Sequence, residues 1–185
     1  MSAWKKVLPA VVITAAVQAA LVWPALTPSS GALFLLLVAA SFAVTVAAVS
    51  VIAGAFAPAP NWQPLVAWSA AIVLVAVLTA IAALALTPVV LLLGLITVPP
   101  VAHAVSPHRG FLVFRRHPAH AILLSLGMLA LSYLAWIAAL LLGFFVTGVL
   151  GAFATWLVFG AVGTVGLRSF SALYRRTTAE PPAQD

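Results

Sequence analysis

The chain has 185 residues, of which 65% are hydrophobic and only 5% are charged. A soluble domain carries about a quarter charged residues, so this composition excludes a water-exposed surface and makes lipid the solvent for most of the chain. The net charge of +6 comes from few cations beside helix ends, which suit anionic lipid headgroups and not nucleic acid. Cysteine is absent, which excludes disulfides, thiolate metal sites and cysteine nucleophiles.

The apolar stretches predict an all-α, polytopic integral membrane protein with six transmembrane helices in three hairpins. A spanning helix needs roughly 20 apolar residues, and prolines with short polar turns divide this chain into segments of about that length. We expect the spans at residues 7–26, 32–56, 65–86, 88–105, 119–140 and 147–167.

Two further predictions concern the N-terminal and C-terminal ends of this membrane domain. Lys5, Lys6 and the apolar run after them resemble a signal peptide, but the run is long, and we prefer a retained first helix. After the sixth span, Leu167, Phe170, Leu173 and Tyr174 share one helical face opposite arginines, which predicts a short interfacial helix to residue 176. The membrane domain then covers residues 1–176, and residues 177–185 form a disordered tail.

The fourth span is the least regular, because Pro99 and Pro100 interrupt it. Consecutive prolines remove two backbone donors and favour a kink near this end of the helix. The length from Pro88 to Val105 is about 27 Å at 1.5 Å per residue, just enough to cross. A shallow re-entrant segment is the alternative.

All eight lysines and arginines lie on one side of a six-span arrangement. The N-terminus, the connector 57–64, the loop 106–118 and the C-terminus share that side. Cytoplasmic loops carry the excess of Lys and Arg, so we expect both termini in the cytoplasm and a multi-pass protein of the cytoplasmic membrane.

The basic loop supplies the first candidate binding residues. Arg115, Arg116 and His117 precede the expected fifth helix, whose free N–H groups favour anions, and Arg109 lies nearby. These four residues are candidates for contact with the phosphate of a phospholipid or a polyprenyl phosphate. Ordinary anchoring by positive charge explains the same arginines without a ligand, and we prefer it.

The histidines suggest two further sites, neither of which we expect. His117 and His120, three residues apart, have the spacing of a metal site, and His103 with His120 has the residue types of a haem site. No carboxylate or thiol lies nearby, and two histidines at one membrane face do not readily flank a haem. We therefore expect no metal and no cofactor.

Small residues recur at helical spacing in four of the expected spans. Such stripes let helix backbones approach closely in a membrane. Packing within the chain is the preferred reading, although the glycine-lined sixth span is the best candidate for docking a partner protein. The stripes are Ala15 and Ala19; Ala39, Ala43 and Ala47; Ala76 and Ala80; and Gly160, Gly163 and Gly166.

The expected spans contain no Asp, Glu, Lys or Arg. Ion coupling and catalysis within membranes usually need such a residue, and Gln18, the strongest polar residue near the middle of a span, suits an interhelical hydrogen bond. With no nucleophile–base pair, we expect no enzyme and no catalytic residue. An accessory or scaffold subunit with an integral membrane partner is the first hypothesis. A small carrier for a neutral or lipidic substrate is the alternative, because broken helices border binding sites in transporters.

Overall fold

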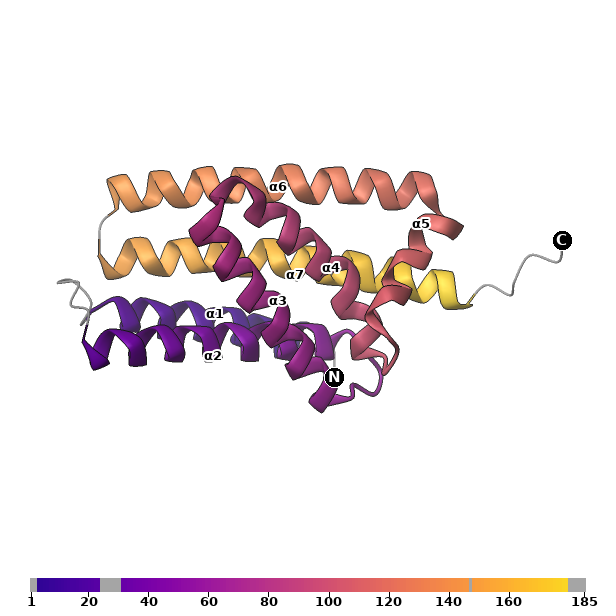
Figure 1. The fold of residues 1–185 in the computed structure, drawn as a ribbon, viewed down its shortest axis with the longest axis horizontal. Coiled ribbons are helices and arrows are strands. Elements are labelled where there is room, and N and C mark those ends of the chain that lie inside the picture. The colour runs from indigo at the N-terminus through magenta and orange to yellow at the C-terminus, as the bar shows by residue number, and fades with distance from the viewer. Residues whose placement is uncertain (1–2, 24–30, 147, 180–185) are drawn as a thin grey trace, which may run out of the picture.

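The computed structural model describes residues 3–23, 31–146 and 148–179, and every regular element in this part of the chain is helical (Figure 1). Two short 3-10 turns, η2 (Leu84–Leu86) and η3 (Pro107–Phe111), accompany seven α-helices. The α-helices are α1 (Trp4–Val22), α2 (Ala32–Ala55), α3 (Trp62–Ala82), α4 (Thr87–Ala102), α5 (Leu112–Arg116), α6 (Pro118–Phe145) and α7 (Val149–Ala179). Six segments, namely α1, α2, α3, η2 with α4, α6 and α7, are long and apolar enough to cross a membrane. The chain is therefore a multi-pass membrane protein.

Prolines and one glycine mark the helix boundaries for simple geometric reasons. Pro88 and Pro118 stand in the first turns of α4 and α6, where a missing N–H costs nothing. Gly148 has a φ of +77° in the turn between α6 and α7, a conformation that side chains with a Cβ disfavour.

The last helix differs most from the expectation. The prediction ended the sixth span at residue 167 and placed an interfacial helix and a tail after it, but α7 runs without a break to Ala179. Residues 177–179 are therefore helical. The apolar face containing Phe170 and Tyr174 is buried inside the protein, since α4 and α5 cover it, and so does not lie on a membrane surface. The expected end of the first span, Thr147 and residues 180–185 lie outside the described residues.

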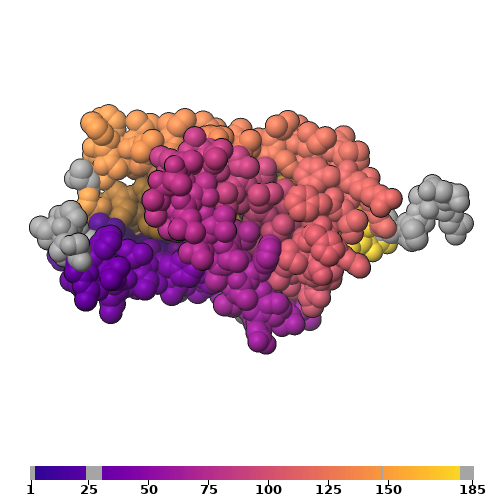
Figure 2. Space-filling model, in the orientation of Figure 1, coloured from indigo at the N-terminus to yellow at the C-terminus, as the bar shows by residue number. Residues whose placement is uncertain are grey.

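The helices form a layered bundle around α7. In Figure 1, α1, α2, α6 and α7 run along the long axis, whereas α3 and α4 cross it obliquely. Helix α7 contacts α1, α4 and α6, and Figure 2 shows α3 and α4 covering its middle. The turn between α3 and α4 ends short of the edge where α2 begins and α6 ends (Figure 1).

The core lies where α4 crosses α7. Residues 94–102 of α4 are all buried, and Phe170 of α7 is among the largest fully buried side chains. A Cβ added to Gly166 would stand 2.6 Å from Leu95 Cδ1, so this glycine lets α7 approach α4 closely. Close backbone approach gives the van der Waals contact that holds helices together in lipid.

Polar side chains inside the bundle join neighbouring helices. Gln18 of α1 donates to the Ser41 carbonyl and to Thr45 Oγ1 of α2, both at 3.0 Å, and accepts from Ser41 Oγ at 2.7 Å. Trp68 Nε1 of α3 donates to Thr97 Oγ1 of α4 at 3.0 Å. The interhelical role expected for Gln18 is therefore confirmed.

Candidate functional site at the basic end of the bundle

The basic loop docks on α4 at the two prolines. Pro100 has no N–H to offer the Ile96 carbonyl four residues earlier, so that carbonyl lacks its helical donor. Gly110 of η3 lies directly against it, because a Cβ added to Gly110 would stand 2.1 Å from the Ile96 oxygen. Only a glycine backbone fits there. The prolines and the glycine therefore fix where the basic loop sits.

A tight turn then reverses the chain after α4. The Val105 N–H donates to the Pro100 carbonyl at 3.0 Å and the Ala104 N–H to the Val101 carbonyl at 3.0 Å. These two bonds form a Schellman motif. Ala104 takes the left-handed position with a φ of 59°, where glycine is more usual. The turn leaves His103 as the last side chain of α4 before the loop.

His103 packs against α7. Its ring centroid lies 5.8 Å from that of Tyr174, with an interplanar angle of 39°. Burial, and then the positive charge of Arg175, lowers the pKa of His103. His103 Nε2 is buried and has no hydrogen-bond partner among the described residues. An unsatisfied buried polar atom costs about 1–3 kcal/mol, which a ligand or water at this place would offset.

Arg109 is a second arginine near these rings. It precedes Gly110 in η3, is exposed, and interacts electrostatically with the Tyr174 hydroxyl. Behind it, Val113 of α5 is buried against Tyr174 and Ala121. Arg109 therefore lies near Tyr174, and Arg175 lies near His103, at one end of the bundle.

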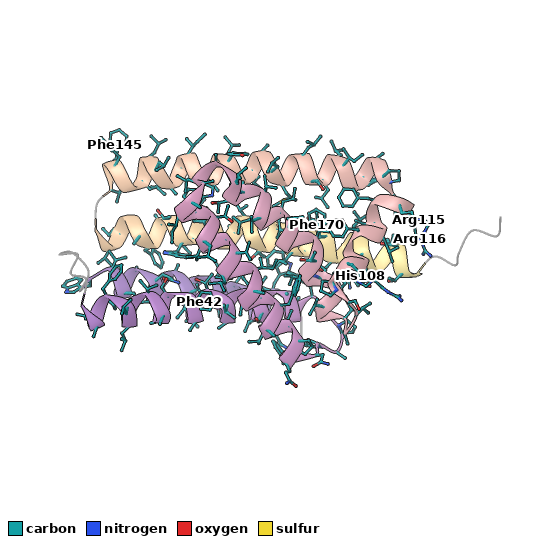
Figure 3. All side chains as sticks on the ribbon, viewed as in Figure 1. Phe42, His108, Arg115, Arg116, Phe145 and Phe170 are labelled. Carbon is teal, nitrogen blue, oxygen red and sulfur yellow. The ribbon has the colours of Figure 1, made fainter. Side chains whose placement is uncertain are left out.

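The other predicted phosphate-contact residues lie elsewhere in the loop. Arg115 and Arg116 end α5 and are exposed, and Figure 3 shows both beside the end of α7. Arg116 Nη1 donates to the Thr177 carbonyl, which ties α5 to the last turn of α7. His117 begins α6, and its ring lies 6.5 Å from that of His120 at 87°. The four predicted residues therefore do not converge on one point.

In the part of the chain that the structure describes, the histidine pair is not part of a larger cluster of metal-ligand side chains. Among residues 3–23, 31–146 and 148–179, no group of three or more His, Cys, Asp or Glu side chains gathers. His103 contacts Tyr174, while His120 contacts His117.

Among the remaining cations, Arg168 joins the start of the chain to α7. Lys5 and Lys6 are exposed in the first turn of α1. The Arg168 guanidinium lies 5.1 Å from the centroid of the Trp4 ring, a cation–π contact. Phe56, at the end of α2, packs edge-on against the same tryptophan with centroids 6.4 Å apart.

The glycines of α7 point in different directions. A Cβ on Gly160 would stand 2.7 Å from Val11 of α1, and one on Gly166 would meet Leu95 and Met128. Only Gly163 faces open space. Two of the three glycines of the predicted stripe, Gly160 and Gly166, therefore pack within the chain.

The alanine stripes divide in the same way. Ala15, Ala19 and Ala76 are buried within the bundle. By contrast, the α2 stripe formed by Ala39, Ala43 and Ala47 is exposed at all three positions.

Comparison of the chain with protein-family models, with curated proteins and with solved structures finds no match in any of the three.

Proposed function

We propose that this chain is a multi-pass protein of the cytoplasmic membrane that acts as a non-catalytic accessory or scaffold subunit of a larger membrane assembly. Its six long helices would be arranged as three hairpins, each entering from the cytoplasmic side, with both ends of the chain in the cytoplasm.

The distribution of charge supports this orientation. Lys5, Lys6, the basic loop and the end of α7 lie towards one end of the bundle, whereas Phe145 lies at the other (Figures 1 and 3). The excess of Lys and Arg marks the cytoplasmic side. Because the chain has no cysteine, single-cysteine labelling has no background. We expect Val146→Cys to react with an impermeant maleimide outside the cell, and Ala59→Cys only after permeabilisation.

The polar chemistry inside the bundle supports a non-catalytic role. No Asp, Glu, Lys, Arg or His occurs between residues 7 and 102 or between residues 121 and 167. Gln18 uses both its amide and its carbonyl in bonds to α2, which leaves little for a substrate. The Ile96 carbonyl that lacks its helical donor is covered by Gly110. The irregular part of α4 therefore serves to dock the basic loop, which favours a subunit over a carrier with a substrate site at this place.

The exposed alanine stripe of α2 is the observation that carries the subunit proposal. Helix α2 is the most apolar of the six long helices and the least buried. Ala39, Ala43 and Ala47 follow one another at four-residue spacing along it without contact to the rest of the bundle that would bury them. Small residues at this spacing are typical of close helix–helix contact in membranes, so we assign this face to a partner helix.

Native mass spectrometry after mild detergent extraction, at natural expression levels, tests the proposal. We expect a complex that contains a second polypeptide. Ala43→Leu should release that polypeptide, because the added side chain blocks close approach. Val38→Leu on the opposite face of α2 is the matched control, since Val38 is also exposed, and should leave the complex intact. A lone 19.1 kDa monomer, or equal effects of the two variants, would contradict the proposal.

A further inference from the structure

We propose that Arg109 and Arg175, beside the packed rings of Tyr174 and His103, form a binding site for the phosphate group of an anionic lipid. This phosphate site draws on three separate segments: η3, the end of α4 and the end of α7.

The fold holds these segments together independently of any ligand. Gly110 places η3 directly against the Ile96 carbonyl. The hydrogen-bonded turn at Ala104 sets the direction of the chain after α4, and Val113 packs against Tyr174. The backbone that carries the two arginines is thus set before a ligand binds, so that only their exposed side chains need to be ordered, which favours affinity.

The charges at this place lack a counterpart within the described residues. The only acidic residues of the whole chain are Glu180 and Asp185, and both lie beyond Ala179. Within the described residues, Arg109 and Arg175 therefore stand beside one His–Tyr pair with no carboxylate next to them. Like charges at one end of the bundle repel each other, and an ion of the opposite sign relieves that repulsion, so an anion from outside the chain fits here.

Phosphate is the anion that suits these donors best. A guanidinium presents parallel N–H groups that match two phosphate oxygens, and such charge-assisted bonds are the strong ones. The buried His103 Nε2, which has no partner among residues 3–23, 31–146 and 148–179, adds an unsatisfied polar atom beside them. The site lies where apolar helices end and basic residues begin, the level of lipid headgroups, which makes a lipid the source of the phosphate.

The test is a titration of the purified full chain in neutral detergent, with bound lipid counted by native mass spectrometry. Phosphatidic acid is the probe, phosphatidylcholine is the zwitterionic control with no net charge, and inorganic phosphate is a third arm. Arg109→Gln combined with Arg175→Gln should weaken phosphatidic acid binding by about tenfold or more, because the loss of even one charge-assisted bond is worth about that factor.

A matched double variant separates a site from general positive charge. Arg115→Gln combined with Arg176→Gln removes the same number of charges from neighbouring exposed positions. It should change phosphatidic acid binding by less than about twofold. Arg109→Lys combined with Arg175→Lys keeps the charges but not the parallel N–H groups, so its binding should fall between that of the natural chain and that of the glutamine pair. Such a graded loss would show that the loss in the glutamine pair is not misfolding.

The remaining outcomes decide the source and the validity of the site. Lipid binding without binding of inorganic phosphate identifies a headgroup, and equal binding of both identifies free phosphate as a ligand of the same site. Equal losses in the two glutamine pairs, or no loss in either, would overturn the proposal.

We also infer that the turn between α3 and α4 lies within the membrane, so that these two helices form a re-entrant hairpin. The inference rests on a hydrogen bond that is independent of the phosphate site. Tyr133 of α6 donates this bond to the Ala85 carbonyl at 2.8 Å. Tyr133 stands about 18 Å from the Phe145 end of α6 at 1.5 Å per residue. This bond therefore fixes the turn near the middle of α6, as the oblique helices in Figure 1 also show.

The composition of the turn suits lipid better than water. Residues 80–86 contain only alanine, leucine and isoleucine, and the side chains of Ile81, Leu84 and Leu86 are 79%, 49% and 56% exposed. Inside a membrane, irregular backbone must find its hydrogen bonds within the protein, and the Tyr133 hydroxyl supplies one of them.

Single-cysteine labelling of intact cells separates a re-entrant hairpin from a complete crossing. We expect Leu84→Cys to resist an impermeant maleimide from either side of the membrane, whereas Val146→Cys is labelled from outside. Labelling of Leu84→Cys from outside at the rate of Val146→Cys would show that the hairpin crosses completely and would overturn the inference.

Discussion

Gly110→Ala is expected to destabilise the protein more than any other change of a single methyl group in the basic loop. The new Cβ would stand 2.1 Å from the Ile96 oxygen and 2.9 Å from the Ile96 carbonyl carbon. To restore ordinary contact, the two backbones must separate until that distance reaches about 3.4 Å. Both are held in place, since Ile96 lies in the buried part of α4 and η3 continues into the buried Val113.

The expected loss follows from this overlap. Overpacking a tight contact costs about 1–3 kcal/mol, and because the obstacle is backbone and not a flexible side chain, we expect the upper half of that range. The free energy of unfolding is measured by sodium dodecyl sulfate titration of the protein in mixed micelles, followed by circular dichroism.

Gly127→Ala on α6 is the matched control for this prediction. A Cβ there meets nothing within 4 Å, and alanine is a better helix former than glycine by about 0.5–1 kcal/mol. The control should therefore be neutral or stabilising. If Gly110→Ala changed the free energy of unfolding by less than about 0.5 kcal/mol, like an ordinary surface substitution, the docking of the loop on α4 would be refuted.

Three further substitutions test other parts of the structure. Gln18→Leu removes the hydrogen bonds from α1 to Ser41 and Thr45 of α2 and should lower the free energy of unfolding by about 0.6–2 kcal/mol. An unchanged unfolding midpoint in the detergent titration would argue against that contact. Ala104→Gly relieves a φ of 59° and should raise the same quantity by about 1 kcal/mol. His103→Asn tests acid sensitivity: because burial and Arg175 lower the pKa of His103 from 6.5, the folded state binds fewer protons, so stability is full above about pH 6.5 and falls as the pH drops below it. The variant should lose part of that decline, and a decline identical to that of the natural chain would contradict the assignment.

The number and class of the long helices follow from the sequence alone. Each is a long apolar run between prolines or polar turns, and that signal needs no tertiary information. The end of the last helix was missed for a physical reason. The amphipathic pattern around Phe170 and Tyr174 is the same whether its apolar face meets a membrane surface or another helix, and in this protein α4 and α5 cover it.

The candidate phosphate site was only partly visible in the sequence. The cluster of charge around Arg109 predicted a basic loop, but its pairing with Arg175 depends on how η3 docks on α4. That docking depends on the contact of Gly110 with a carbonyl freed by Pro100, and no periodicity in the sequence signals it. The partner face could not be predicted from the sequence either, because the alanine stripes containing Ala43 and Ala15 have the same spacing. Only the structure shows that Ala15 is buried and Ala43 is exposed.

Photocrosslinking in intact cells tests the subunit proposal most directly, because it samples the membrane before any extraction. A photoreactive side chain is placed at Ala43 on the exposed stripe of α2, or at Val38 on the opposite face as the control. The account predicts a discrete protein adduct from position 43 that is absent from position 38. Adducts with lipid alone at both positions would contradict it.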